Sequence, residues 1–333
     1  MATLNQTKNT LLDVAKRLDP NGKIAKIVEL LSVDNGILDD IMFKEANEMT
    51  SHVTTVRTGL PAVYWRLLNA GVQPSKSTTA QIKEGIGMLE AWSVCDVKLA
   101  KMSGNEKEYR LSEAKAFLEA MKQEAAQTIF YGNSSVAPEE FNGLSIRYSS
   151  LSAPNAQNII NGGGSGSDNS SVWLVCWGEQ TVHGIYPKGS KAGVDHVDHG
   201  LQIEQNAGGV TGAQMEVYKD KFSWDMGIAL KDWRYAARLC NIDISNLVTN
   251  STPADLVDLL IKLTHRIPNK NLGKCVIYMN RTVFQYLDIQ RRNDMVAGGS
   301  LDYKDVDGQA IYSFRGIPVK IEDALLETEA TVA

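Results

Sequence analysis

Apolar residues recur at steps of three and four over residues 112–131, the longest uninterrupted amphipathic pattern in the chain. The positions that would share one face of an α-helix are Leu111, Ala114, Phe117, Leu118, Met121, Ala125 and Ile129. We predict a single helix of about 30 Å at ~1.5 Å per residue, with Ser112 as N-cap and Gly132-Asn133 as a left-handed C-terminal cap. Its predicted core residues are Leu111, Leu118, Met121 and Ile129.

Taken alone, this stretch is most typical of an ordinary core helix. Its flanks favour a second interpretation, because a long polar, strand-like segment precedes it and a Gly-rich, strand-rich region follows it. The pattern therefore leaves open whether the helix serves one core or a larger assembly.

The N-terminal pattern predicts two short amphipathic helices over residues 7–18 and 23–32, separated by the turn Pro20-Asn21-Gly22. An apolar cluster follows at residues 37–43 on a segment too short to form its own core. We expect this arm to pack on something else.

From His52 the pattern becomes extended. Residues 53–58 alternate and are β-branched, and residues 76–82 and 88–97 predict returning strands. About forty residues here carry few large apolar groups apart from Trp65 and Trp92. An isolated two-stranded ribbon is marginal in water, so this segment needs a neighbour.

Beyond residue 131 the pattern predicts a mixture of strands, loops and helices, which makes the chain an α+β protein. Expected strands cover residues 172–177, 182–186, 215–219, 222–243, 274–279 and 314–321, the last broken near Pro318. Residues 151–171 and 187–212 are expected to be Gly-rich loops. Expected helices are residues 252–266, with Thr252 as cap and Pro253 in first position, and residues 282–292.

Composition indicates how many domains the chain can form and argues against one class of function. With 333 residues, 43% of them hydrophobic, we expect a folded, soluble protein of one large or two coupled domains. The net charge of -5 argues against a dedicated nucleic-acid binder, which needs a basic face. The first thirty residues lean basic, a feature more typical of solvated helix faces than of a polyanion site.

The four cysteines, Cys95, Cys176, Cys240 and Cys275, are widely spaced and include no CxxC pair. A zinc site or a disulfide framework is therefore not expected, and a reducing compartment fits best. The N-terminus lacks an apolar signal core, and no run approaches the ~18 apolar residues that a membrane span needs.

One pair of histidines has a spacing that suits a metal. His196 and His199 form a His-x-x-His pattern, but they lie in a predicted Gly-rich loop without an evident third ligand. A polar surface loop is the more economical interpretation. His52, His183 and His265 are isolated and are expected to be structural.

Other chemical motifs fail on inspection. The glycines at 162–166 lack the Gly-Lys-Ser/Thr ending of a phosphate-binding loop, and Ser167 stands where a nucleophile elbow needs glycine. The carboxylate pairs Asp39-Asp40 and Glu139-Glu140 fall at expected loop or helix ends, where solvation explains them better than acid/base catalysis. We expect no catalytic, cofactor-binding or metal-binding residues.

Several short motifs together resemble the major capsid proteins of tailed bacteriophages of the Hong Kong 97 type, in particular the short-tailed subgroup. The motifs cover most of the chain and are Arg57-Thr58-Gly59-Leu60-Pro61, Tyr64-Trp65-Arg66, Tyr131-Gly132-Asn133, Asn142-Gly143-Leu144, Tyr278-Met279-Asn280-Arg281 and Gly316-Ile317-Pro318-Val319. Each motif is modestly specific, and the set is stronger.

The resemblance implies a shell subunit with a spine helix, a peripheral domain and an axial domain. The implied segments are an N-terminal arm (1–50), an extended loop (51–98), a peripheral domain with the spine helix (99–139), a first axial segment (140–215), a strand returning to the peripheral domain (216–245) and a second axial segment (246–333). Arg57, Trp65, Arg66 and Trp92 are the expected inter-subunit contacts.

The resemblance also implies what the shell contains and contacts. Expected partners are other copies in hexamers and pentamers, cement, scaffolding and portal proteins, and packaged double-stranded DNA bound non-specifically, with no membrane and no cofactor. The virion would be assembled in the bacterial cytoplasm. The alternative is a soluble cytoplasmic enzyme with its active site in residues 162–212.

The order of segments departs from the family pattern as the resemblance implies it. The stretch 222–243, which resembles a closing strand of the peripheral domain, precedes the motifs at 278–281 and 316–319. We therefore expect a permuted connectivity, with residues 222–243 beside the helix at 112–131 and the C-terminal ninety or so residues in the axial domain.

Overall fold

The computed structural model describes residues 35–206, 210–249, 252–293, 301–306 and 309–333. The chain divides into two compact units. The described portion of unit 1 is residues 88–125, 193–206 and 210–225, and that of unit 2 lies within 34–87, 126–192 and 226–333. The helices predicted over 7–18 and 23–32 lie outside the described residues.

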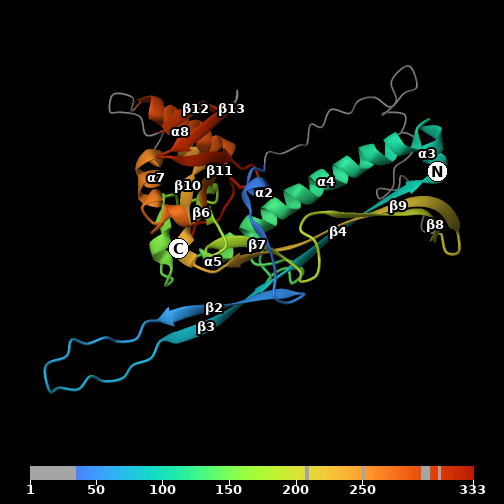
Figure 1. Cartoon of the computed structure of the whole chain (residues 1–333). Helices are drawn as coiled ribbons and strands as arrows, with labels where there is room; N and C mark the ends of the chain where they lie inside the picture. The colour runs from blue at the N-terminus through green and yellow to red at the C-terminus, as the bar shows by residue number, and fades with distance from the viewer. Residues whose placement is uncertain (1–34, 207–209, 250–251, 294–300, 307–308) are drawn as a thin grey trace. The chain divides into compact units, whose positions relative to one another are not determined.

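Unit 2 is built on a mixed β-sheet, whose strands run in the order β12-β13-β14-β11-β6-β7 (Figure 1). These strands are β6 (Asn169–Trp177), β7 (Val182–Tyr186), β11 (Lys274–Met279), β12 (Leu301–Val306), β13 (Gln309–Phe314) and β14 (Ile317–Ile321). β10 (Ala236–Asp243) pairs antiparallel with β6 and parallel with β5 (Ile159–Asn161). All nine residues of β6 are buried, so this strand lies at the centre of the unit.

Helices cover this sheet and complete its core. They are α5 (Leu144–Arg147), α6 (Ile244–Thr249), α7 (Leu256–Thr264) and α8 (Arg281–Asn293), with short 3-10 turns η1 (Ala156–Asn158), η3 (Trp233–Tyr235) and η4 (Lys270–Leu272). Leu260 of α7 and Leu287 of α8 pack with Leu174 of β6 in one apolar cluster. Burial of each of these leucine side chains stabilises the folded unit by roughly 1.5–3 kcal/mol.

Two element boundaries in unit 2 differ from the prediction. Helix α7 begins at Leu256, because the side chain of Asp255 accepts from the Asp258 amide and caps it; Thr252 and Pro253 precede the helix. The expected strand 314–321 is broken at Arg315 and Gly316 and not near Pro318, which lies within β14. Both Arg315 and Gly316 have positive φ and form the tight turn between β13, which ends at Phe314, and β14.

The cysteine prediction was also wrong. Cys176 of β6 and Cys275 of β11 are directly opposed in the antiparallel register and form a disulfide. Spacing along the chain could not reveal this pair, since 99 residues separate the two positions and only strand pairing brings them together. Cys95 and Cys240 are buried and are not part of this disulfide.

The segment after residue 34 packs on its own chain. Ile37 of α2 (Ile37–Asp40) and the following Ile41 are buried, and β1 (Phe43–Glu45) pairs parallel with β7. The apolar cluster at 37–43 therefore finds much of its partner surface within unit 2, whereas the sequence suggested burial elsewhere. Met42 remains 44% exposed.

Unit 1 combines a long helix with a small sheet. It contains α3 (Val97–Met102), β8 (Asp195–Gln205) and most of α4 (Glu106–Tyr131), β4 (Gly87–Asp96) and β9 (Gln214–Leu230). In the sheet, β9 pairs with both β8 and β4, and its residues 226–230 belong to unit 2. α4 begins six residues before the predicted start, because the Asn105 side chain accepts from the Glu108 amide and caps the helix. Ser112 instead donates to the carbonyl of Tyr109 inside the helix.

Two predictions about residues 187–243 are corrected. Residues 195–205, expected as loop, form β8, because β9 supplies a backbone partner along most of their length. The stretch 222–243 is two strands and not one: Phe222 in β9 stacks on Phe117 of α4 at 6.0 Å, but residues 236–243 form β10 in the sheet of unit 2. The stretch is therefore divided between a strand that contacts α4 and a strand of the unit 2 sheet.

The end of α4 uses glycine for close packing. Neither Gly132 nor Asn133 has a positive φ, so the predicted left-handed cap is wrong. A Cβ atom at Gly132 would lie 2.4 Å from the Phe141 carbonyl oxygen and 2.7 Å from that of Thr128. Glycine is needed because two backbone segments meet there.

Candidate assembly surfaces

The most unusual feature of unit 2 is a long hairpin. β2 (Ser51–Gly59) and β3 (Thr78–Gly85) pair only with each other in the described structure, and residues 60–77 connect them as an irregular loop (Figure 1). We call β2, β3 and this connection the extended hairpin, and residues 60–77 the hairpin loop.

The hairpin loop exposes large apolar side chains. Five of them are between 79% and 103% exposed: Leu60, Val63, Trp65, Leu67 and Leu68. The expectation of few large apolar groups in this segment was wrong, because it considered mainly the tryptophans. Exposed apolar side chains grouped on one loop mark an interaction site.

The charge of the extended hairpin has one sign over most of its length. Between Arg57 and Lys83 there is no Asp or Glu, while Arg66 and Lys76 add two further cations. Arg66 also holds the loop in shape, since its Nε donates to the Ala70 carbonyl at 2.8 Å. A partner surface for this hairpin should therefore be apolar and neutral or acidic.

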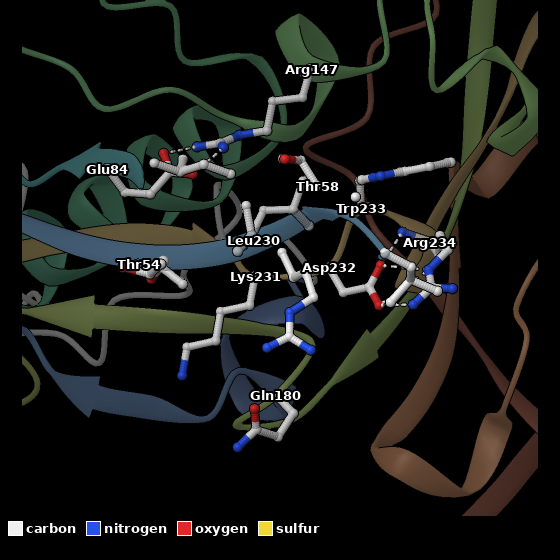
Figure 2. Close-up of a pocket in the computed structure, with 16 residues that line it drawn as sticks. Thr54, Thr58, Glu84, Arg147, Gln180, Leu230, Lys231, Asp232, Trp233 and Arg234 are labelled. Atoms are coloured by element: carbon white, nitrogen blue, oxygen red, sulfur yellow. Dashed lines mark hydrogen bonds and ion pairs between the residues drawn. The ribbon is translucent and has the colours of Figure 1, made fainter. Parts of the chain in front are cut away.

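A groove of about 1070 Å³ lies beside strand β2 of the extended hairpin (Figure 2). Residues 54–60 of β2 line it together with the segment Leu230–Arg234. Glu84 on β3 and Arg147 at the end of α5 form a bidentate ion pair with distances of 2.5 and 2.6 Å, and both side chains are largely buried. This pair fixes one strand of the hairpin to the sheet unit.

The groove also carries positive charge. Asp232 and Arg234 pair with each other, whereas no carboxylate within the described ranges pairs with Arg57 or Lys231. Figure 2 shows the Lys231 side chain extended away from the Asp232–Arg234 pair. Burial and the nearby Lys44 lower the pKa of Lys231. The groove therefore continues the cationic character of the hairpin loop.

Trp92, predicted as an inter-subunit contact, lies on β4 in unit 1. Its ring stacks on His199 with centroids 5.3 Å apart, and the Lys221 ammonium lies 5.7 Å from its centroid. Trp92 remains 47% exposed. It differs from Trp65, which is fully exposed, because some of its surface is already covered by its own unit.

The two histidines of the His-x-x-His pattern have different partners. His196 stacks on Phe222 at 4.7 Å, and its Nε2 lies 3.1 Å from Asp220, which also binds Arg110. His199 instead stacks on Trp92. Among the described residues no group of three or more His, Cys, Asp and Glu side chains could hold a metal ion.

The predicted core residues of the long helix do not behave alike. Met121 and Ile129 are buried and Leu118 is half-buried, but Leu111 is 58% exposed. Leu111 is therefore corrected to a surface position. Tyr109 takes the inner position in this turn, where it packs fully buried against Cys95 and Leu99.

Asp40 is a structural contact that the sequence patterns missed. Its carboxylate accepts from Lys274 at 2.6 Å, Lys320 at 2.8 Å and the Tyr278 hydroxyl at 2.8 Å. Burial alone would raise its pKa, but these three donors hold the pKa below its ordinary value. Asp40 thus ties α2 to the strands β11 and β14, and the lysines on these strands gave no signal in sequence.

The Gly-rich stretch at 162–166 has a packing role. The amides of Gly162 and Gly164 donate to the carbonyls of Cys240 and Asn241 on β10, and a Cβ at either glycine would lie 2.8 Å from the Asn241 oxygen. Nothing in this geometry supports the enzyme alternative. Within the described chain, no helix is long and apolar enough to cross a membrane.

Comparison with known proteins gives consistent matches. A family model described as major capsid protein GP7 matches residues 19–333. A chain in the near-atomic cryo-EM structure of bacteriophage Epsilon15 is 35% identical, with 100% of this chain and 99% of that chain covered and a TM-score of 0.76. The capsid of bacteriophage JBD30 is 9% identical, with coverage of 90% and 95% and a TM-score of 0.48. No curated protein matches.

The match at 35% identity extends over the whole fold, and the family model covers the extended hairpin, the long helix and the sheet unit. These findings agree with the resemblance to Hong Kong 97-type capsid proteins drawn from the sequence motifs. The chain belongs to the GP7 family of major capsid proteins and is a structural subunit of a phage head shell.

Proposed function

We propose that this chain assembles with itself into the hexamers and pentamers of an icosahedral shell that encloses the double-stranded DNA of a tailed bacteriophage. The extended hairpin is the principal arm that joins one subunit to the next. It can serve this role because its loop carries side chains that its own unit leaves uncovered.

The observation that carries the proposal is the exposure of the hairpin loop. Trp65 is 103% exposed and Leu68 is 96% exposed. Burying such side chains against a neighbour stabilises the contact by roughly 25 cal/mol for each Å² of apolar surface. Every subunit repeats the same contact, so a modest free energy per hairpin becomes large over a closed shell.

Excision of the hairpin loop tests this proposal. Gly59 and Thr78 are opposed in the β2–β3 register, so residues 60–77 can be replaced by an Asn-Gly turn without disturbing the strands. The shortened subunit should keep the thermal stability of the full chain and fail to form shells. Electron microscopy and sedimentation velocity measure the assembly, and circular dichroism measures the fold.

A matched control alters a loop of unit 2 outside the extended hairpin. Val136, which is 81% exposed, is replaced by serine; shells should form as before. Normal shells from the excised variant would show that the hairpin loop does not join subunits.

Arg57, Trp65, Arg66 and Trp92 are proposed inter-subunit contacts. An exposed ion pair made by Arg57 or Arg66 would contribute about 0.2–1 kcal/mol. Lys76 would add to the same attraction toward an acidic neighbour, whereas Lys83 already pairs with Glu48 at 3.3 Å.

The remaining expectations belong to the same proposal. The chain has no enzymatic activity. It is assembled in the bacterial cytoplasm and is part of the virion. Its further partners are packaged DNA, which it contacts non-specifically, and portal, scaffolding or cement proteins. Its membership of the short-tailed subgroup, the domain boundaries given above and a segment order permuted relative to the family stay predictions.

A further inference from the structure

Two buried histidines meet where the extended hairpin joins the sheet of unit 2. His52 is the second residue of β2 and His183 lies in β7, and their ring centroids are 5.9 Å apart at an interplanar angle of 82°. His52 is 8% exposed and His183 is 0% exposed. This edge-to-face contact joins the start of the hairpin to the central sheet.

The hydrogen bond of His52 requires a neutral ring. Its Nδ1 accepts from the backbone amide of Asn47 at 3.3 Å, so the proton of the neutral ring is on Nε2. A protonated imidazole carries hydrogen on both nitrogens and has no acceptor. Protonation would therefore break this bond and place two donors against each other.

The surroundings of His183 disfavour a protonated ring even more strongly than those of His52. Neither ring nitrogen has a hydrogen-bond partner among the described residues, and the side chain is fully buried. An imidazolium without acceptors in such a site would be poorly solvated. The position therefore favours the neutral form strongly.

The charged groups around the pair strengthen this preference. Lys44 on β1 and Lys231 after β9 are the nearby cations, and Glu179 and Glu84 are the nearby anions. Both carboxylates already have partners, since Glu179 pairs with Lys44 and Glu84 pairs with Arg147. Burial, and then Lys231, lower the pKa of His183 to about 4; burial also lowers the pKa of His52.

We propose that His52 and His183 form a proton-sensitive latch, which holds the root of the extended hairpin on β7 when neutral and releases it when protonated. The root consists of residues 47–52, where the Asn47 side chain bonds both the amide and the carbonyl of Val53. The Ile86 amide donates to the Thr50 carbonyl, so both strands of the hairpin are tied to this turn. Release would loosen the hairpin without unfolding the sheet.

The direction with pH follows from the lowered pKa. An opened root exposes the imidazole, whose pKa then returns to its ordinary value of 6.5, while the closed root keeps the pKa of His183 at about 4. Opening therefore binds a proton between these values and becomes more favourable as the pH falls. For His183 alone, the opening equilibrium should rise about thirtyfold from pH 7.5 to pH 5.

Hydrogen-exchange mass spectrometry on the full-length chain tests the latch. The peptide covering residues 47–52 is compared at pH 7.5 and pH 5, after correction for the intrinsic pH dependence of amide exchange. The wild-type chain should show at least the thirtyfold rise in opening expected for His183 alone, and His183→Gln, which cannot be protonated, should show a much smaller ratio. His265→Gln is the matched control, because His265 is exposed, and it should keep the wild-type ratio.

A second variant keeps the test decisive if His183→Gln does not fold. In His52→Gln the amide oxygen can accept the Asn47 amide hydrogen, and this variant should also show a smaller ratio than the wild type. The proposal is overturned if wild-type exchange in this peptide is independent of pH, or if the folded variants at positions 52 and 183 keep the full wild-type ratio.

Discussion

Arg238 and Glu329 form a buried ion pair in unit 2, with 2.8 Å between Nη2 and Oε2 and each side chain 5% exposed. The pair joins β10 to the C-terminal segment, 91 residues apart in sequence. The guanidinium also donates to the carbonyl of Tyr148, and the carboxylate accepts from Ser171 and from Tyr131 at the end of α4. Burial and Glu329 raise the pKa of Tyr131, which keeps this donor protonated.

Loss of the arginine should be costly, because it would leave a buried carboxylate with neutral partners only. We expect Arg238→Met to lower the free energy of unfolding by about 3–5 kcal/mol. Denaturant titration of the unassembled subunit measures this loss.

The control for this change is Arg234→Met. Arg234 pairs with Asp232 at 2.7 Å, close to the 2.8 Å of the Arg238–Glu329 pair, but the Arg234 side chain is 55% exposed. An exposed pair contributes at most about 1 kcal/mol. Equal losses in the two variants would show that burial of the Arg238 pair is not what makes it important.

Two positions on the long helix α4 should respond differently to the same substitution. Met121 is 3% exposed, so Met121→Asp should cost more than about 3 kcal/mol by burying a charge. Leu111 is 58% exposed, so Leu111→Asp should cost less than about 1 kcal/mol. Thermal denaturation compares them, and a large loss at Leu111 would contradict its surface position.

Trp65 should affect assembly and not folding. Because its side chain is 103% exposed, Trp65→Ala should change the free energy of unfolding by less than about 0.5 kcal/mol. At a subunit interface a tryptophan of this kind contributes roughly 2 kcal/mol or more. We therefore expect the concentration needed for shell formation, measured by light scattering, to rise at least about tenfold. An unchanged concentration threshold for shell formation would show that Trp65 is not part of the subunit interface.

Gly132 should not accept a side chain. A Cβ atom at this position would lie 2.4 Å from the Phe141 oxygen, so Gly132→Ala should cost about 1–3 kcal/mol through overpacking. At Gly85 nothing lies within 4 Å of the same atom and φ is not positive, so Gly85→Ala should be neutral or slightly stabilising. Chemical denaturation separates the two, and a neutral Gly132→Ala would show that the helix end can move away.

Local patterns were sufficient for much of the fold. The apolar residues at steps of three and four around Met121 indicated a long helix, and the apolar run at 172–177 indicated the strand that is β6. These predictions succeed because side chains at fixed spacings share one face of an element whatever lies opposite. The strands expected at 53–58 and 76–82 were visible for the same reason and pair as β2 and β3. The returning strand expected at 88–97 is β4, which pairs with β9 and is not part of the extended hairpin. The motifs around the hairpin indicated the capsid family.

Other features depended on which elements meet. Residues 195–205 include many polar side chains and a glycine, so their pattern did not predict a strand. They nevertheless form β8, because the backbone of β9 pairs with them. The helix start at Glu106 depended on the side-chain geometry of Asn105, and the exposure of Leu111 followed from Tyr109 taking the inner position.

The sequence by itself determined the main helix, the extended hairpin and the family, because these depend on spacing and short motifs within one stretch. Only the tertiary structure decided that Asp40 holds Lys274 and Lys320, that Arg238 meets Glu329, and that His52 meets His183. The physical reason is that polar and charged side chains bond to whichever group the strand pairing brings within about 3 Å. That pairing is set by the burial of the whole sheet, and no local pattern encodes it.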